Sequence, residues 1–497
     1  MNKAEVDLLK KIDFGDIDGL YDPNLGEYFL DFDYSKSIIT GDAAFIIGRK
    51  GTGKSALYNW IEKKQKDGDV LVANLSFKDF PFEKLLNLSD DQFAVPNQYQ
   101  TIWRNIILSE LACLILKDQK NKPSDEYNIL TSYVLYHFGK DIIDLHKEIT
   151  RKAEKKGCTI SFPKIAQGGI ENETATDLKD GLSNITLINR RLFEIIEAYL
   201  KTNPTSKYII QFDQLDDNYT VYLNNERYFQ AIISLFKAAY DINQTFRSKH
   251  IPVKIALYLR SDIYNRIDKF DAESARWDEF RLTLNFSIIN RSDWNNPKLL
   301  QIINKRIINS LGNFSRNPFG ELFRNDKIKL EEFGHIQEPF RYIIHRTFHR
   351  PRDVVQFCKK IQAEVKKTDT LYYRTIKDAE KEYSLWLLSE LANEIAPVIH
   401  DLEALYELLR LMGSNDYSMN DFRSRYSKFK PAIRMEEEEL LRELYNFGII
   451  YNVSFSWNRS RQMFSITRND RSVFNRDLRI MTHSGFYQGL YTSKFTT

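Results

Sequence analysis

One run of eight residues constrains the fold of this chain more than any other feature: Gly48, Arg49, Lys50, Gly51, Thr52, Gly53, Lys54 and Ser55. The run fills the pattern G-x-x-x-x-G-K-[ST] without a gap. It follows an apolar stretch at residues 43–47 and opens an amphipathic stretch at residues 54–64. A strand that passes through such a loop into a helix is the context of a phosphate-binding loop. Backbone N–H groups must curl around phosphates there, and only glycines let the backbone come so close. A glycine-rich turn without a ligand is the alternative.

The motif predicts a role for each side chain of the loop. We expect the eight residues and Ala56 to bind a nucleotide, with Lys54 reaching the β- and γ-phosphates and Ser55 ligating Mg²⁺. ATP is favoured over GTP, because residues 121–125 are one residue longer than the guanine-reading pattern N-K-x-D and precede the metal strand.

The surrounding pattern predicts an α/β fold, a P-loop NTPase core with a parallel sheet. Apolar runs that predict strands alternate with helical stretches, which is typical of parallel sheets covered on both faces. The predicted strands are residues 43–47, 70–75, 208–212, 254–259 and 282–286, and the predicted helices are residues 54–64, 99–116, 187–201 and 226–246.

Two further strands end in charged side chains. The strand at residues 207–213 ends in Asp213, which we expect to hold Mg²⁺ at a site beside the P-loop strand. Asp216 and Asp217 follow, and one of them would polarise the attacking water. The strand at residues 254–259 precedes Arg260. If that strand lies between the other two, Arg260 points at the γ-phosphate; a surface ion pair is the alternative.

The pattern along the whole chain predicts four parts. These are an N-terminal segment (1–37), the ATPase core (38–290) with an insertion (118–184), a helical lid (291–396) and a winged-helix-like domain (397–497). The lid helix that begins near Pro351 carries Arg352, which would reach back to the nucleotide, or would be merely solvated. Helical stretches fill the lid, at residues 298–311, 337–348, 352–366 and 371–395. Three more helices and a hairpin at 449–457 and 462–467 predict the winged helix.

These motifs in this order resemble the ASCE division of P-loop ATPases, and more narrowly the STAND and AAA+ ATPases. The sequences that carry the resemblance are IIGRKGTGKSAL, FDQLDD, LRSD, RPRD and ITRNDRSVFNRDLRIMTHSGFYQGL. The resemblance implies a sensor arginine at Arg260, a helical lid and a winged helix. It is strongest to bacterial ATPases that accompany antiphage systems, and so implies a defence role. Asp217 stands where glutamate is commoner, which leaves the base open between Asp216 and Asp217.

Charge narrows the choice of partners. The chain of 497 residues has 71 basic and 68 acidic residues, which excludes a polybasic nucleic-acid binder. The predicted third helix of the winged helix carries four glutamates, at positions 436–439, which would repel phosphates. If nucleic acid is contacted, the wing and tail should do it, through Arg459, Arg461, Arg468 and Arg471. A protein partner or effector in trans is favoured, and a homo-oligomer is left open.

The remaining composition indicates a cytoplasmic protein that binds no membrane. The three cysteines, Cys113, Cys158 and Cys358, match no metal or disulfide spacing. The N-terminus has no signal-peptide pattern, and the longest apolar stretch, residues 106–116, is shorter than the roughly 20 residues of a membrane span.

The sequence therefore predicts Mg²⁺-dependent ATP hydrolysis that drives a conformational or assembly switch. The nucleotide would lie between core and lid. The alternative is a nucleotide-gated binding protein with little turnover, which docks DNA or a partner through its tail.

Overall fold

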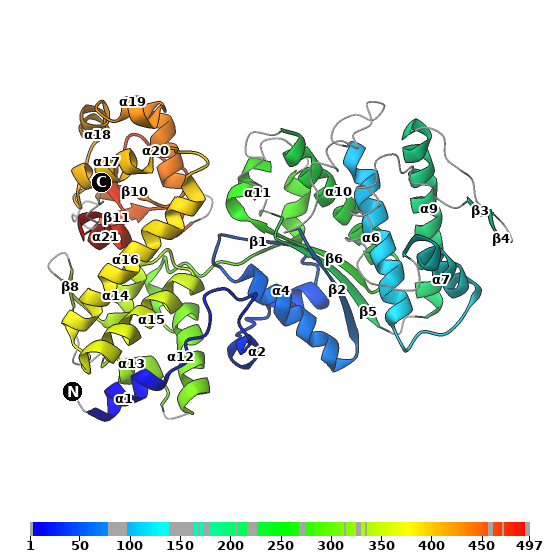
Figure 1. Cartoon of the computed structure of the whole chain (residues 1–497), viewed down its shortest axis with the longest axis horizontal. Coiled ribbons are helices and arrows are strands. Elements are labelled where there is room, and N and C mark those ends of the chain that lie inside the picture. The colour runs from blue at the N-terminus through cyan, green and yellow to red at the C-terminus, as the bar shows by residue number, and fades with distance from the viewer. Residues whose placement is uncertain are drawn as a thin grey trace. The chain divides into compact units, whose positions relative to one another are not determined.

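A computed structural model of the chain shows two compact units (Figure 1). It describes residues 3–77, 97–138, 164–166, 169–171, 178–203, 206–215, 226–267, 274–312, 315–324, 330–332, 335–455, 461–469 and 472–492. The first unit comprises Met1–Leu30, Lys50–Gly53 and Asn285–Thr497, and the second comprises Asp31–Arg49 and Lys54–Leu284. Each unit has its own layers and core.

A five-stranded sheet forms the centre of the second unit. Its strands are β1 (Phe45–Gly48), β2 (Val70–Ser76), β5 (Lys207–Asp213), β6 (Val253–Arg260) and β7 (Arg281–Thr283). The order is β2-β5-β6-β1-β7, and every neighbouring pair is parallel. The predicted α/β class is confirmed. We expected the strand that ends in Asp213 to lie directly beside the P-loop strand. It does not, because β6 hydrogen-bonds to both strands and separates them.

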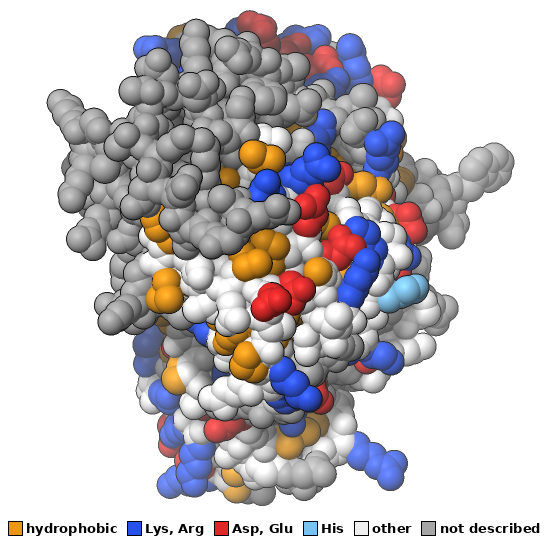
Figure 2. Space-filling model, turned by 90° about the vertical axis from the view of Figure 1, so that its right-hand side faces the viewer, with side chains coloured by type: hydrophobic (Ala, Val, Ile, Leu, Met, Phe, Trp, Pro, Cys, Tyr) orange, Lys and Arg blue, Asp and Glu red, His pale blue; other side chains and the backbone are white. Residues whose placement is uncertain are grey.

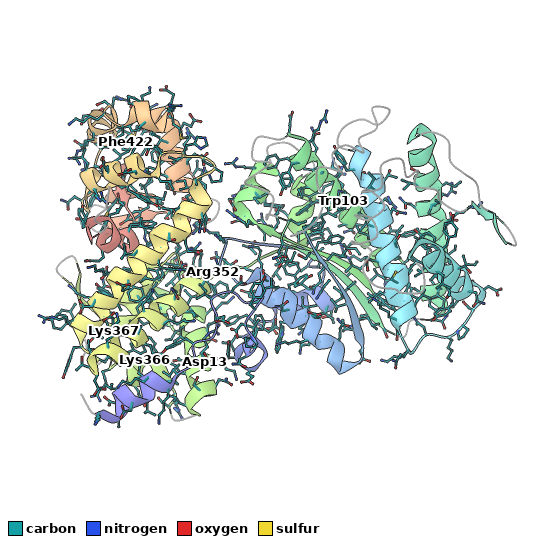
Figure 3. The ribbon with its side chains drawn as sticks, in the orientation of Figure 1. Asp13, Trp103, Arg352, Lys366, Lys367 and Phe422 are labelled. Atoms are coloured by element: carbon teal, nitrogen blue, oxygen red, sulfur yellow. The ribbon has the colours of Figure 1, made fainter. Side chains whose placement is uncertain are left out.

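Helices cover the sheet of the second unit. The helices that contact its strands are α3 (Tyr34–Ile39), α4 (Lys54–Lys63), α6 (Asn97–Lys117), α10 (Glu226–Ser248) and α11 (Ser261–Ile267). Helices α7 (Asp125–Phe138) and α9 (Leu178–Thr202) pack on α6. Helix α4 packs on β1, β2 and β5, whereas α6 and α10 pack on each other and on strands of the sheet. Trp103 of α6 is fully buried, and its indole N–H donates to the Ala231 carbonyl of α10 at 2.9 Å (Figure 3).

The predicted insertion is described only in part. The sequence predicts a helix at residues 125–137 of the insertion, which α7 matches. Helix α9 begins at Leu178, earlier than the predicted start at residue 187. A small antiparallel pair, β3 (Lys164–Ala166) and β4 (Gly169–Glu171), was not predicted. The sequence also predicts a charged helix at residues 142–156, followed by a polar loop with Gly168 and Gly169. The charged helix and Gly168 lie outside the described residues, and Gly169 begins β4, so the loop prediction is wrong there. On the face shown in Figure 2, basic, acidic and apolar side chains are interspersed over the described part.

The first unit is helical over most of residues 298–395. Its elements there are α12 (Lys298–Leu311), α13 (Pro318–Leu322), β8 (Leu330–Glu332), β9 (His335–Gln337), α14 (Pro339–Arg346), α15 (Pro351–Thr368) and α16 (Tyr373–Ile395). The N-terminal helix α1 (Lys3–Lys11) packs on α12, α13 and α15, and α2 (Leu25–Tyr28) packs on α12. The Gln362 amide of α15 donates to the carbonyls of Leu9 at 2.8 Å and Ile12 at 2.7 Å. The first 30 residues therefore belong to the same unit as these helices.

The C-terminal part of the first unit places short helices before a three-stranded sheet. The helices are α17 (Leu402–Met412), α18 (Met419–Tyr426), α19 (Lys430–Ile433) and α20 (Glu437–Asn446). The antiparallel sheet has the order β11 (Arg461–Phe464), β10 (Ile450–Phe455), β12 (Arg479–Thr482), and α21 (Tyr487–Thr492) follows. The hairpin was predicted, but β12 was not.

Short 3-10 helices span Lys64–Asp67, Ser274–Phe280, Arg291–Trp294 and Ser484–Phe486. Of the helices that the structure describes, none combines the length and the apolar character that a bilayer crossing needs.

Candidate functional site

The glycine-rich loop joins β1 to α4, as predicted. Gly51 and Gly53 have φ angles of +83° and +93°, a region that side chains other than glycine rarely adopt. The ammonium of Lys54 is buried and donates to the carbonyls of Gly48 at 3.0 Å and Arg49 at 3.3 Å. The lysine is thus folded against the loop's own backbone. Thr52 is buried, and Ser55 and Ala56 lie half-buried in the first turn of α4.

Asp213 and Ser55 belong to elements that pack together. Asp213 ends β5 with only 3% of its surface exposed. Helix α4, which carries Ser55 in its first turn, packs on β5. Burial first, and the charge of Asp213 second, raise the pKa of Tyr58, which lies one turn after Ser55. A hydroxyl and a carboxylate are the hard oxygen ligands that Mg²⁺ prefers. The residues present therefore fit a magnesium ion.

A neutral polar network that was not predicted from the sequence lies beside Asp213. Gln211, two residues before Asp213, donates through its amide to the Tyr58 carbonyl at 2.9 Å and to the Asn74 side chain at 2.7 Å. The Tyr258 hydroxyl of β6 donates to the Gln211 amide oxygen at 2.9 Å. Burial and the Asp213 charge raise the pKa of Tyr258, so this hydroxyl remains a donor at neutral pH. The available signal was a single glutamine among the apolar residues of a buried strand.

Arg260 lies next to the loop, because β6 pairs with β1 and its register places Arg260 opposite Gly48. Its guanidinium makes a bidentate ion pair with Asp262, at 3.0 Å from Nε to Oδ1 and 2.7 Å from Nη2 to Oδ2. Burial opposes the charge on Asp262, but Arg260 outweighs it, and with Lys54 holds the Asp262 pKa below its usual range. The condition that β6 lies between β1 and β5 is met. The arginine is nevertheless ion-paired, and its side chain is 11% exposed and that of Asp262 32% exposed.

The tip of the loop, Lys50–Gly53, belongs to the first unit, where α15 and α16 contact it. The Arg352 N–H donates to the Gly51 carbonyl at 3.3 Å, and the Arg352 side chain packs where a Cβ on Gly51 would meet it at 3.1 Å (Figure 3). Glu390 of α16 binds Arg352 at 3.2 Å and Lys50 at 3.7 Å. Glu394, one turn later, lies 3.6 Å from the Lys50 ammonium. Arg352 is therefore held against the loop and is not free in solvent.

Arg350 contacts the same tip and was not among the predicted site residues. Its Nη1 donates to the Lys50 carbonyl at 3.0 Å, across 300 residues of sequence. The side chain is 3% exposed and is held by Asp353, with Nε to Oδ2 at 2.9 Å. Burial opposes its charge, but Asp353 and Glu394 outweigh burial and raise the pKa of Arg350. The two arginines that flank Pro351 were the available signal. Of the two, only Arg350 is buried.

Several predicted residues cannot be placed. Asp216, Asp217, Arg459 and Arg471 lie outside the described residues, as does Cys158, and the side chain of Arg461 is not described. Arg468 is described, but its side chain lines a small cavity. Within the described ranges, no group of three or more His, Cys, Asp or Glu side chains could hold a metal ion by itself.

Sheet, glycine loop and buried strand-end carboxylate together define the P-loop NTPase fold. Residues 297–392, which span most of α12 to α16, match a family model described as the FunZ-associated C-terminal helical domain. The chain is 22% identical over 385 residues to the putative transposon gamma-delta 80.3 kDa protein of Escherichia coli K12. That match covers 76% of this chain and 50% of the relative, so the chain spans about half of the relative's length. The solved ORC2 protein of Aeropyrum pernix, in ADPNP–ADP complexes, aligns with 92% of this chain and 88% of its own at 12% identity, with a TM-score of 0.39.

Proposed function

We propose that this chain is an ATPase that binds Mg·ATP at the glycine loop and uses hydrolysis to switch conformation or assembly. The observation that carries the proposal is the loop itself: a parallel strand, two glycines with positive φ, and a buried lysine at the start of a helix. Backbone N–H groups and a helix N-terminus of this geometry favour phosphate. Lys54 would exchange its two carbonyl partners for phosphate oxygens, which carry full negative charge.

The remaining groups would act around the phosphates. Ser55 and Asp213 would hold Mg²⁺, which neutralises charge on the transferring phosphoryl group. Asp216 or Asp217 would orient the attacking water. Arg260 would have to release Asp262 before it could bind the γ-phosphate, so the ion pair would act as a latch on the arginine. Arg352, whose backbone N–H donates to the Gly51 carbonyl, would move together with the loop tip.

Steady-state ATP turnover tests the proposal. We expect Lys54→Ala and Asp213→Ala each to lower kcat by roughly a hundredfold, which equals about 2.7 kcal/mol of transition-state stabilisation. Lys63→Ala is the matched control, because Lys63 is an exposed lysine at the far end of the same helix and should leave turnover unchanged. Undiminished hydrolysis in both site variants would contradict the proposal.

A second candidate function is a nucleotide-gated binding protein with little turnover. The pairing of Arg260 with Asp262 favours it, because an occupied arginine does not stabilise transferring charge. Tight ATP binding with turnover that neither DNA nor a partner stimulates would support this candidate. Retention of bound nucleotide by Asp216→Ala would instead support hydrolysis with an acidic base.

The output of the switch is proposed to be a protein partner, with a role in bacterial antiphage defence drawn from the motif resemblance alone. In the proposed winged helix, three of the four consecutive glutamates near the start of α20 are already paired. Glu437 binds Arg423, Glu436 binds Lys430, and Glu438 binds Arg442. An acidic helix start of this kind disfavours contact with phosphates. Co-purification in the presence and absence of Mg·ATP would identify the partner.

A further inference from the structure

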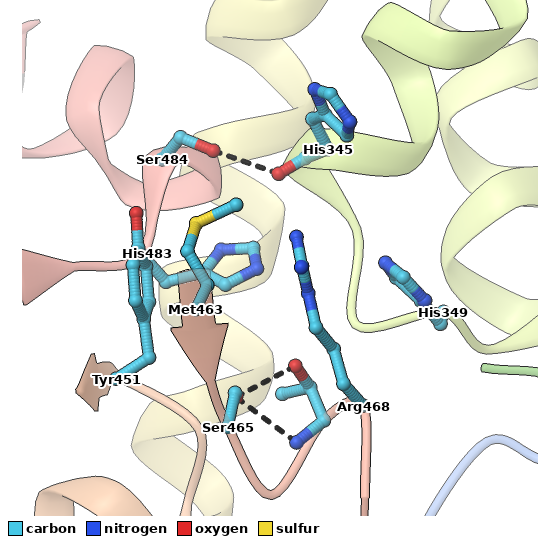
Figure 4. Close-up of a pocket in the computed structure, with 9 residues that line it drawn as sticks. His345, His349, Tyr451, Met463, Ser465, Arg468, His483 and Ser484 are labelled. Atoms are coloured by element: carbon cyan, nitrogen blue, oxygen red, sulfur yellow. Dashed lines mark hydrogen bonds between the residues drawn. The ribbon is translucent and has the colours of Figure 1, made fainter. Parts of the chain in front are cut away.

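A small cavity lies in the first unit, between the α14–α15 junction and the C-terminal sheet (Figure 4). Its volume is about 40 Å³. A single water needs about 10–15 Å³ on this scale, so the cavity has room for about three waters or one small anion and is too small for a nucleotide. The lining residues are His345, His349, Tyr451, Met463, Ser465, Thr467, Arg468, His483 and Ser484.

Arg468 extends through this cavity. Figure 4 shows its side chain between His483 and His349, with the guanidinium end directed toward His345. The turn that carries it is fixed by hydrogen bonds: the Arg468 N–H donates to the Ser465 carbonyl at 3.1 Å, and the Thr467 N–H donates to the Ser465 hydroxyl at 3.1 Å. The backbone of the turn that carries Arg468 is therefore held by two hydrogen bonds.

The charge of Arg468 is not balanced by a carboxylate. Burial lowers the pKa of its guanidinium, and the group that opposes this shift is the Tyr451 hydroxyl. No Asp or Glu lines the cavity, and in the part of the chain that the structure describes none forms an ion pair with Arg468. Arg468 is half-buried, whereas the buried Arg346 and Arg350 of this unit pair with Glu380 and Asp353. The buried Arg306 donates to the Phe14 carbonyl. A cation withdrawn from water without a counter-charge is unfavourable, so an anion in the cavity would be stabilised.

Two buried histidines also line the cavity. His349 and His483 are 5% and 7% exposed, and each accepts a backbone N–H at Nδ1, from Ile288 at 3.0 Å and from Gly485 at 3.1 Å. A ring that accepts at Nδ1 carries its proton on Nε2, which makes Nε2 a donor. Arginine in the centre disfavours a metal cation, whereas N–H and O–H donors around one guanidinium suit an oxyanion.

We propose that this cavity binds one small tetrahedral oxyanion of the phosphate class, with Arg468 as its charged ligand. The anion would complete the contact between the α14–α15 junction, which supplies His349, strand β10, which supplies Tyr451, and the turn after β11, which supplies Arg468. This site is separate from the nucleotide loop. It also gives Arg468 a different role from the one expected for a basic wing, since a side chain inside a cavity takes a single phosphate and does not track a nucleic-acid backbone. Free inorganic phosphate and a terminal phosphomonoester share this chemistry.

Phosphate titration of the full chain tests the proposal, with Lys54→Ala as the background so that the glycine loop does not contribute. Isothermal titration with inorganic phosphate at constant ionic strength should show one saturable site. Addition of Arg468→Gln should weaken binding by roughly tenfold or more, because hydrogen bonds to charged groups are among the strongest. Arg476→Gln is the matched control, because Arg476 is an exposed arginine of the same C-terminal segment, 3.8 Å from Glu438, and should bind phosphate as the background does.

The source of the phosphate is distinguished by a second arm with a 5′-phosphorylated dinucleotide and its unphosphorylated form. Binding of both phosphate and the phosphorylated dinucleotide supports an open site, binding of phosphate alone supports an enclosed one, and binding of the phosphorylated dinucleotide alone supports a chain-end site. Equal binding in Arg468→Gln, or no saturable binding of either probe, would overturn the proposal. If Arg468→Gln does not fold, Arg468→Lys keeps the charge without the planar fork, and its affinity should again fall.

Discussion

Single glycines and charged side chains carry most of the chemistry of the loop. Gly51 has a positive φ and leaves room for only a hydrogen atom beside Arg352. Gly68 has a nearly identical φ of +81°, but an added Cβ there would meet nothing within 4 Å. The two glycines thus separate backbone strain from crowding.

Alanine at each position should show this difference in the free energy of unfolding. Gly68→Ala adds strain alone and should lose about 1–2 kcal/mol. Gly51→Ala adds the same strain and a contact 3.1 Å from the Arg352 Cβ, so we expect it to lose about 1 kcal/mol more. Urea unfolding of both variants measures the difference. Equal losses would mean that Arg352 does not pack against Gly51.

Asp262 predicts a dependence of stability on pH. Its folded pKa lies below the usual value, so the carboxylate stabilises the fold above its unfolded pKa of about 3.9, and this contribution is lost as the pH falls through the lower folded pKa. Asp262→Asn should therefore lose about 1 kcal/mol at pH 7. The difference from the wild type should shrink below about pH 4.

Unfolding curves at pH 7, 5 and 3.5 check this expectation. Asp69→Asn is the control, because Asp69 is an exposed carboxylate of the same unit that pairs with Lys120 on the surface, and such pairs contribute about 0–1 kcal/mol. A constant difference between wild type and Asp262→Asn across this range would show that the Arg260 pair does not shift the carboxyl group.

At the scale of elements, the junction between α14 and α15 organises the loop tip. Pro351 begins α15, and Asp353 in its first turn accepts hydrogen bonds from the Phe348 N–H at 2.9 Å and from Arg350. Arg350 in turn donates to the Lys50 carbonyl. One fully buried carboxylate therefore connects the start of a helix to the loop.

Asp353→Ala should lower the free energy of unfolding by about 3–5 kcal/mol, because it leaves the buried Arg350 without its main counter-charge. Asp378→Ala, at an exposed position of α16, should change stability by no more than about 0.5 kcal/mol. Chemical denaturation of both variants is the measurement. A loss below about 1 kcal/mol for Asp353→Ala would show that Arg350 finds another partner.

At the scale of the whole molecule, the first unit is assembled from distant parts of the chain. Residues 1–30 join residues 285–497, and Leu9 of α1 is fully buried. Its neighbour Leu8 is 36% exposed. Two adjacent leucines of α1 therefore differ in their surroundings: Leu9 is packed in the core, and Leu8 lies at the surface.

Leu9→Ala should destabilise the first unit by about 2–5 kcal/mol, through lost burial and the cavity that remains. Leu8→Ala should have a much smaller effect. Thermal unfolding of the full chain, followed by calorimetry, measures both. Similar effects for the two variants would contradict the packing of α1 on α12, α13 and α15.

The sequence by itself determined the features that depend on local spacing. The loop motif, the five strands and most helices follow from patterns within about 20 residues, because backbone geometry and the alternation of apolar side chains are local properties. The tertiary structure alone decided the partners of the charges. Arg260 binds Asp262, Arg350 reaches Lys50 across 300 residues, and Arg468 enters a cavity. Which carboxylate or carbonyl a charged side chain contacts depends on which distant segments pack together. Burial then makes the loss of that partner energetically costly. The pattern of residues could predict that arginines follow strands and open helices, but not which of them the fold would bury.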